Sequence, residues 1–367
     1  MTWGVVLSFL LLGCGGTAQP SAKPAASGGS QWDQVVAAAK QEGALVMTGQ
    51  AGSAVAESLT AGFKGRYPDI KLDFTGGNGN ELVTKMLTER RAGRYTIDLM
   101  VQGPPNLLDL VAAEAVDPIP PLLVGPDEDP SKWTDQKFSF SDNTGKYVLA
   151  MLGGMGGVGI YNPKLVPISE LTSYKDFLNP KWKGKIAMLD PRLPGSAQAA
   201  VQFWYISPEI GKDFIKQLFE QQQVAINKDD RQLTDWVAKG EYPIGLGANG
   251  FAAVELRKNG VAVEFISAGN LKEGGHLTAS WGGVAVLNKA PHPNATRVYL
   301  NWLLSKEGQE ALVRAAGYPS RRQDVSNEGV LDATLVRANT HPIELNQENY
   351  VRQRPEVVAY LKTLLGS

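Results

Sequence analysis

The chain has 367 residues, and its 36 lysines and arginines almost balance its 37 aspartates and glutamates. This balance gives no support to nucleic-acid binding or to a basic membrane-facing surface. Beyond the N-terminal extension, about 335 residues remain, which is more than one hydrophobic core usually holds, so we expect two lobes.

The chain begins with an apolar run, residues 3–13, that is too short to cross a bilayer of ~30 Å as a helix. The sequence LLGC at its end resembles the bacterial lipobox, in which a signal peptidase cuts before the cysteine and a lipid is attached to the sulfur. No lysine or arginine precedes the run, and a buried N-terminal strand is the alternative interpretation. We expect residues 1–13 to be a lipoprotein signal peptide and Cys14, the chain's one cysteine, to be the lipidation site.

Residues 14–31 are expected to form a flexible, lipid-anchored tether. From Gly15 to Ser30 the chain has no large apolar side chain and a single charge, Lys23. Such a segment cannot bury enough surface to fold. A coil of this length spans about 20–25 Å, which would hold a globular protein clear of a membrane.

From residue 30 the chain alternates predicted helices and strands. Ser30 is a candidate N-cap and Gly43 a stop signal for the first helix. The series continues with strand 44–50, helix 51–68, strand 70–76, helix 80–94, strand 96–103 and helix 106–115. This alternation predicts parallel α/β layers.

After a proline-rich stretch at 117–130 the pattern changes, and residues 146–162 read as a long extended stretch broken by glycines. A second α/β series follows: strand 183–191, helices 195–205 and 209–221, strand 224–227, helix 229–240, strand 242–248, helix 251–260 and strand 261–266. Residues 280–290 are again extended, and residues 294–317 form an amphipathic helix pair. Two α/β series joined by extended crossovers imply two lobes with a cleft between them.

Four Gly-, Ser- or Asn-rich loops follow predicted strands and open predicted helices: residues 50–53, 76–80, 194–198 and 247–250. Free N–H groups and the helix dipole at such loops favour an anion or a polar group. The alternative is a tight turn that needs no ligand, with Asn80 as an N-cap. Their recurrence at the carboxyl ends of strands favours ligand binding.

Other motifs give no support to catalysis. The stretch GMGGVG (154–159) matches the dinucleotide fingerprint, but it runs into Pro163 instead of opening a helix. The adjacent acids Asp229 and Asp230 are expected to cap the helix that follows them. The three histidines are not spaced as a metal-ligand pair, and G-x-S-x-G and H-E-x-x-H are absent. We expect no enzyme activity, metal site or cofactor.

Several blocks between about residues 32 and 325 carry a family resemblance: VGIYNPKLV, SYKDFLNPKWKGKIAMLDPRLPGSA, GEYPIGLGANG and GVAVLNKAPHPNATRVYLNWLLSKEGQEAL. Through this set the chain resembles bacterial extracellular solute-binding proteins of ABC importers, in the ferric-iron, thiamine, phosphonate and sugar-phosphate branch. The resemblance implies an α/β, two-lobed type II periplasmic-binding-protein fold with extended crossovers and an interlobe cleft. Lobe one would hold residues 32–152 plus 284–317, and lobe two residues 157–280 plus 318–367.

The resemblance also implies where the ligand lies. The expected contacts are Gln50, Ser53, Asn78, Asn80 and Gln102 from lobe one, and Ser196, Arg231 and Asn249 from lobe two. Iron-binding members of this branch carry neighbouring tyrosines where this chain has Phe251 and Ala252. We therefore expect an anionic or zwitterionic organic solute and no direct binding of ferric iron.

The function implied is capture of a small polar solute and its delivery to ABC permease subunits. The protein would be a monomer outside the cytoplasm, held by its N-terminal lipid to a bacterial membrane, in the periplasm or at the cell surface. One alternative is a ligand sensor that presents its bound form to a receptor. The other is an enzyme on the same fold, which the lack of a catalytic constellation disfavours.

Overall fold

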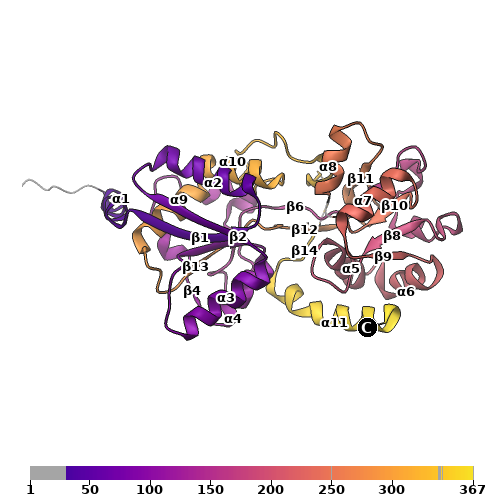
Figure 1. Cartoon of the computed structure of the whole chain (residues 1–367), viewed down its shortest axis with the longest axis horizontal. Helices are drawn as coiled ribbons and strands as arrows, with labels where there is room; N and C mark the ends of the chain where they lie inside the picture. The colour runs from indigo at the N-terminus through magenta and orange to yellow at the C-terminus, as the bar shows by residue number, and fades with distance from the viewer. Residues whose placement is uncertain (1–29, 249, 338–339, 341, 367) are drawn as a thin grey trace, which may run out of the picture.

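The computed structural model describes residues 30–248, 250–337, 340 and 342–366. It is a mixed α/β protein with a large sheet in each half and a small sheet between them (Figure 1). The predicted lipidation site Cys14 and the predicted ligand contact Asn249 lie outside the described residues.

The first sheet has the strand order β2-β1-β3-β13-β4, and β5 pairs with β13 beside this path. Its strands are β1 (Ala44–Gln50), β2 (Lys71–Gly77), β3 (Leu99–Gln102), β4 (Val116–Asp117), β5 (Leu149–Ala150) and β13 (Gly283–Leu287). Strands β1, β2 and β3 pair in parallel, whereas β13 runs antiparallel to β3 with Gly283 opposite Gln102. The sheet is therefore mixed and not wholly parallel as predicted, because β13 enters it on the chain's return from the other half.

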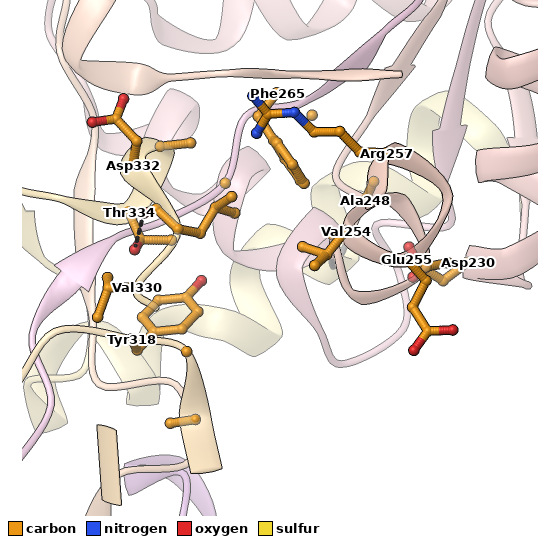
Figure 2. Close-up of a pocket in the computed structure, with 18 of the residues that line it drawn as sticks. Asp230, Ala248, Val254, Glu255, Arg257, Phe265, Tyr318, Val330, Asp332 and Thr334 are labelled. Atoms are coloured by element: carbon orange, nitrogen blue, oxygen red, sulfur yellow. Dashed lines mark hydrogen bonds between the residues drawn. The ribbon is translucent and has the colours of Figure 1, made fainter. Parts of the chain in front are cut away.

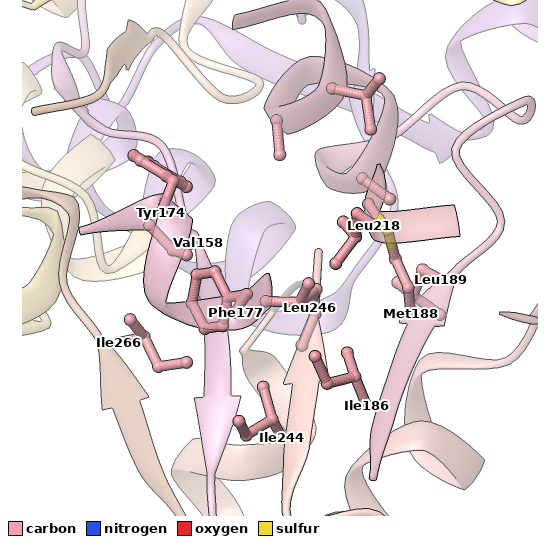
Figure 3. Close-up of a cluster of buried hydrophobic side chains, with 14 of the residues drawn as sticks. Val158, Tyr174, Phe177, Ile186, Met188, Leu189, Leu218, Ile244, Leu246 and Ile266 are labelled. Carbon is pink, nitrogen blue, oxygen red and sulfur yellow. The ribbon is translucent and has the colours of Figure 1, made fainter. Parts of the chain in front are cut away.

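The second sheet has the order β11-β7-β10-β8-β9. Its strands are β7 (Gly159–Tyr161), β8 (Ile186–Leu189), β9 (Ala225–Asn227), β10 (Ile244–Leu246) and β11 (Glu264–Ile266). Figure 3 shows its core, in which Phe177, Ile186 and Leu246 are fully buried. Burial of each such side chain stabilises the fold by about 1.5–3 kcal/mol.

A third, small sheet lies between the two halves in the order β14-β12-β6. It consists of β6 (Gly154–Met155), β12 (His276–Thr278) and β14 (Ile343–Glu344). The stretch GMGGVG thus forms β6 and the start of β7 and opens no helix, as the sequence indicated.

Helices cover both large sheets. Around the first lie α1 (Gln31–Glu42), α2 (Ser53–Arg66), α3 (Gly79–Arg91), α4 (Pro104–Ala112), α9 (Pro293–Leu304) and α10 (Lys306–Ala316). Around the second lie α5 (Ser196–Ile206), α6 (Gly211–Gln221), α7 (Asp230–Lys239) and α8 (Phe251–Lys258). The long α11 (Glu348–Leu365) comes last. Short 3-10 helices occupy Pro120–Leu122, Pro130–Lys132, Thr134–Gln136, Ile168–Glu170, Tyr174–Leu178, Pro180–Trp182, Ala268–Asn270 and Asp332–Thr334.

The predicted limits of the first helix are confirmed. The Ser30 hydroxyl accepts the Asp33 N–H at 3.2 Å, and the Asp33 carboxylate accepts the Ser30 N–H at 2.8 Å. This reciprocal capping box satisfies two N–H groups that the first helical turn leaves free. Gly43 ends the helix with φ of 67°, a backbone conformation that glycine adopts without steric cost.

The lobe boundaries expected from the sequence stay a proposal, and the packing differs from them after Gly317. Ser320 pairs with Leu152 and Arg322 with Trp133, and Val325 joins the first core. Residues 320–325 therefore lie against the first lobe, although the sequence had assigned them to the second. The chain crosses only later, where β14 joins the small sheet.

Candidate ligand-binding site

A cavity of about 1090 Å³ lies between the lobes. The first lobe contributes residues 315–318, at the end of α10, and residues 329–334. The second lobe contributes residues 228–231, at the start of α7, residues 248, 250, 252, 254, 255, 257 and 258, around the start of α8, and residues 265–266. We call this space the interlobe cavity, and Figure 2 shows its two facing walls.

On the first-lobe wall, Tyr318 turns its phenol toward the cavity beside Thr334 (Figure 2). Gly317 ends α10 with φ of 63°, a left-handed conformation, and both Gly317 and the following Tyr318 line the cavity. Burial raises the pKa of Tyr318 to about 12, so the phenol is a neutral donor at physiological pH. The Thr334 hydroxyl already donates to the Leu331 carbonyl at 2.7 Å and keeps its acceptor capacity.

The described wall of the interlobe cavity carries equal numbers of acidic and basic side chains: Asp229, Asp230, Glu255 and Asp332 against Lys228, Arg231, Arg257 and Lys258. Among these charges, Arg257 and Asp332 each pair with a residue that is not part of the wall. The Arg257 Nε lies 3.1 Å from Glu264, and the Asp332 carboxylate lies 3.3 Å from Arg337. The cavity therefore offers both signs of charge around an apolar patch that includes Ala248, Val254 and Phe265.

The predicted contacts at the first two loops of lobe one lie at a strand end or at a helix start. Gln50 ends β1, and Ser53 is the exposed first residue of α2. Asn78 caps α3, and its side-chain oxygen accepts the Asn80 N–H at 3.0 Å. The side-chain oxygen of Asn80 accepts from Asn106 at 2.5 Å. The N-cap of α3 is therefore Asn78, whereas the alternative interpretation had expected Asn80.

Gln102, at the end of β3, is buried, with 4% of its surface exposed. Its side-chain oxygen accepts the Gly103 N–H at 3.0 Å, while its Nε2 has no hydrogen-bond partner within the described part of the chain. Leaving a buried amide donor unpaired costs about 1–3 kcal/mol. Among the predicted contacts of lobe one, Gln102 is therefore the residue that would gain most from an additional hydrogen-bond acceptor.

In lobe two, Ser196 begins α5, and its hydroxyl donates to the Gly247 carbonyl at 2.5 Å, which ties this helix to the end of β10. Arg231 lies in the first turn of α7, and its exposed side chain lines the interlobe cavity. Arg231 is the one predicted contact in the cavity's described wall, whereas Gln50, Ser53, Asn78, Asn80, Gln102 and Ser196 lie outside that wall. As ligand contacts, all of these residues stay predictions.

Sequence reasoning missed the wall formed by Tyr318 and Thr334 and the side chains of Arg257 and Phe265. The stop signal at Gly317 is readable from the sequence. Nothing local, however, indicates that the irregular segment after it returns to face α8.

The described residues also lack two features. No group of three or more His, Cys, Asp or Glu side chains there is placed to hold a metal ion. No helix in the same part of the chain has the length and apolar character needed to span a membrane.

Comparison with known sequences identifies both a family and a curated relative. The family described as bacterial extracellular solute-binding protein matches residues 25–310. A Haemophilus influenzae protein without an assigned function is 27% identical over 290 residues, which cover 75% of this chain and 77% of that protein.

Solved structures with the same fold cover nearly all of the chain. Iron-bound HitA from Pseudomonas aeruginosa superposes with a TM-score of 0.63 at 18% identity, covering 88% of this chain and 99% of its own. AfuA from Actinobacillus pleuropneumoniae, with fructose-6-phosphate bound, gives 0.61 at 19% identity, with 88% and 98% covered. The spermidine/putrescine-binding protein PotD from Streptococcus pneumoniae gives 0.64 at 14% identity, with 88% and 99% covered. These superpositions establish the two-lobed fold, but at such low identities they do not identify the ligand.

Proposed function

The chain belongs to the bacterial extracellular solute-binding proteins of ABC importers, with the type II periplasmic-binding-protein fold, and we propose that it captures its solute in the interlobe cavity. The protein then delivers this solute to the permease subunits of an importer and performs no chemistry itself. The observation that carries the proposal is the cavity, which is lined by both lobes. Its volume of about 1090 Å³ is large enough for a small organic molecule.

The balanced charges of the cavity wall favour a zwitterionic organic solute over a simple anion. Arg231 would bind a carboxylate or phosphate of the solute. An ammonium group would be bound by Glu255 on the lobe-two wall or by Asp332 on the lobe-one wall. The body of the solute would lie against Phe265 and Val254. Such a solute remains within the anionic or zwitterionic class that the sequence predicted.

The same wall disfavours direct binding of ferric iron. As a hard cation, ferric iron prefers anionic oxygen ligands, including phenolates. Ala252, at one of the two places where iron-binding relatives carry tyrosines, lines the cavity. Tyr318 is the described phenol in the wall, and burial raises its pKa, which makes loss of its proton to a metal ion less favourable than for an exposed tyrosine.

A thermal-shift screen tests the proposal, with zwitterionic amino compounds, organic phosphates, phosphonates, carboxylates, polyamines and neutral sugars as separate arms. A solute at about 100 times its dissociation constant stabilises the folded state by about 2.7 kcal/mol. We expect stabilisation in the zwitterionic arm and none by ferric citrate. Stabilisation by no arm would contradict solute binding, and tight iron uptake with a tyrosinate charge-transfer band would contradict the ligand class.

A further inference from the structure

The last helix, α11, contacts both lobes. Figure 1 shows it along one edge of the molecule, with the small sheet between it and the side on which α8 lies. It contacts α4 of the first lobe and packs on α5 and α6 of the second. Apart from the three strands of the small sheet, α11 is therefore a separate physical link between the lobes.

The attachment to lobe one combines the packing of Val351 against the core under α4 with hydrogen bonds made by two neighbouring residues. The Glu348 carboxylate accepts the Asn143 N–H at 2.9 Å, and the Glu348 N–H donates to the Ser141 carbonyl at 2.7 Å. The Gln347 amide donates to the Phe140 carbonyl at 3.1 Å. The Asn143 N–H, with a further contribution from Arg352, holds the pKa of the Glu348 carboxyl below its usual range. Glu348 is thus an ionised acceptor fixed on the first lobe.

The attachment to lobe two is broader. Val357 and Leu361 are fully buried in the second core. Tyr360 donates to the Lys212 carbonyl at 3.1 Å, and the Arg192 guanidinium donates to the Gly366 carbonyl at 2.9 Å. Because it buries two apolar side chains, this attachment is the stronger of the two, so a strained link would give way at Glu348 first.

Pro355 lies inside α11. Two residues before it already bond the second lobe, since the Tyr350 carbonyl accepts from the Gln202 Nε2 at 2.5 Å and the Arg354 Nε donates to the Gln202 Oε1 at 3.2 Å. A proline inside a helix has no N–H for the carbonyl four residues earlier, here Val351, and helices bend most easily at such positions. Because lobe two holds α11 on both sides of Pro355, a bend at this proline does not separate the two lobes' attachments, and rotation of the lobes strains the contact of Glu348 with Asn143.

We propose that Glu348 is a positioning residue for the interlobe site, because its contact with Asn143 ties α11 to lobe one and so sets the separation of the lobes in the ligand-free protein. The separation itself is independent of any ligand. Its consequence for affinity rests on the proposed function, since a solute that bridges the lobes binds best when they already stand at the bound distance.

Distance measurements between two spin labels test this without a ligand. Cys14→Ser removes the chain's one cysteine, and Lys85→Cys on α3 and Lys216→Cys on α6 then place exposed labels on opposite lobes. Into this full-length background go Glu348→Ala and the matched control Glu356→Ala. Glu356 lies on the same helix but bonds Tyr205 at 2.5 Å, a contact with the second lobe alone.

We expect Glu348→Ala to shift the interlobe distance distribution by more than its wild-type width and to speed hydrogen exchange at the Asn143 amide. Glu356→Ala should leave both unchanged, even if the two variants lose similar thermal stability. An unchanged distance in Glu348→Ala, or an equal shift in Glu356→Ala, would overturn the proposal. Failure of the proposed function would look different, as a shifted distance in a protein that binds no screened solute.

Discussion

The imidazole of His276 packs directly against the backbone of Gly156, in the small sheet that joins the lobes. A Cβ placed on Gly156 would overlap the His276 ring. The Gly156 N–H donates to the His276 carbonyl at 2.8 Å, and the ring of Phe203 lies 5.8 Å from the imidazole, centroid to centroid. The junction between the lobes therefore leaves no room for a side chain at position 156.

Gly156→Ala should destabilise the protein. The added methyl group must displace a buried ring, and overpacking of this kind costs about 1–3 kcal/mol. Urea unfolding measures the loss. The matched control is Gly157→Ala, since a Cβ at the next position meets the Ala248 carbonyl oxygen at 3.6 Å, an ordinary contact. Equal stability of the two variants would contradict the packing.

His276 should make the folded state lose stability in mild acid. Burial, and secondarily the nearby charge of Arg354, lower the pKa of His276 to about 4, against a usual 6.5. Between these two values the unfolded chain binds a proton that the folded protein does not. The contribution of neutral His276 is therefore complete above pH 6.5 and is lost as the pH falls toward about 4, by up to about 3 kcal/mol.

The measurement is the free energy of unfolding at pH 7.5 and pH 5 for the wild type and His276→Gln. Whatever its absolute stability, the variant should show a smaller loss between the two pH values. His292→Gln serves as the control, because this histidine is partly exposed and its Nδ1 lies 2.9 Å from the buried Asp98 carboxylate of lobe one, away from the small sheet. An equal loss in wild type and His276→Gln would disprove the assignment.

Cys14 is predicted to carry the lipid anchor. The mature protein should begin at a diacylglyceryl-modified Cys14, and Cys14→Ser should leave the protein unprocessed or release it from membranes. Intact-mass analysis of membrane-extracted protein decides the question. An unmodified Cys14 in that fraction would rule the anchor out.

Arg231→Gln should weaken binding of the solute found in the screen about ten- to a hundredfold, because one hydrogen bond between charged groups is worth about 1.5–3 kcal/mol. Lys239→Gln is the control, since it removes an exposed charge from the last turn of the same helix. Calorimetric titration measures both. Unchanged affinity in Arg231→Gln would remove this residue from the site while leaving the cavity proposal to stand.

The sequence predicted the elements whose signals are local. Ser30 and Gly43 delimit α1 through neighbours in the chain, and the first strand lies at residues 44–50 as predicted. The antiparallel entry of β13 was not predictable in this way, because it depends on where the chain returns from the other lobe.

The candidate site was predicted less completely for the same reason. Glycine and asparagine in the sequence do indicate the loops that begin helices. In the structure, however, Asn78 caps α3, and the Ser196 hydroxyl bonds the Gly247 carbonyl and so links α5 to the end of β10. The Tyr318 wall and the two-lobe attachment of α11 both depend on contacts between residues far apart in sequence. Pro355 is a local signal against a continuous helix, yet it lies inside α11.

The most direct test of solute capture between the lobes is to fill the interlobe cavity and titrate the screened solute by calorimetry. Ala252→Trp places a large side chain in the cavity wall, whereas Ala61→Trp adds the same side chain to an exposed position on α2. If the solute binds in this cavity, Ala252→Trp should abolish measurable heat while its circular dichroism stays native, and Ala61→Trp should bind like the wild type. Wild-type affinity in Ala252→Trp would contradict the account.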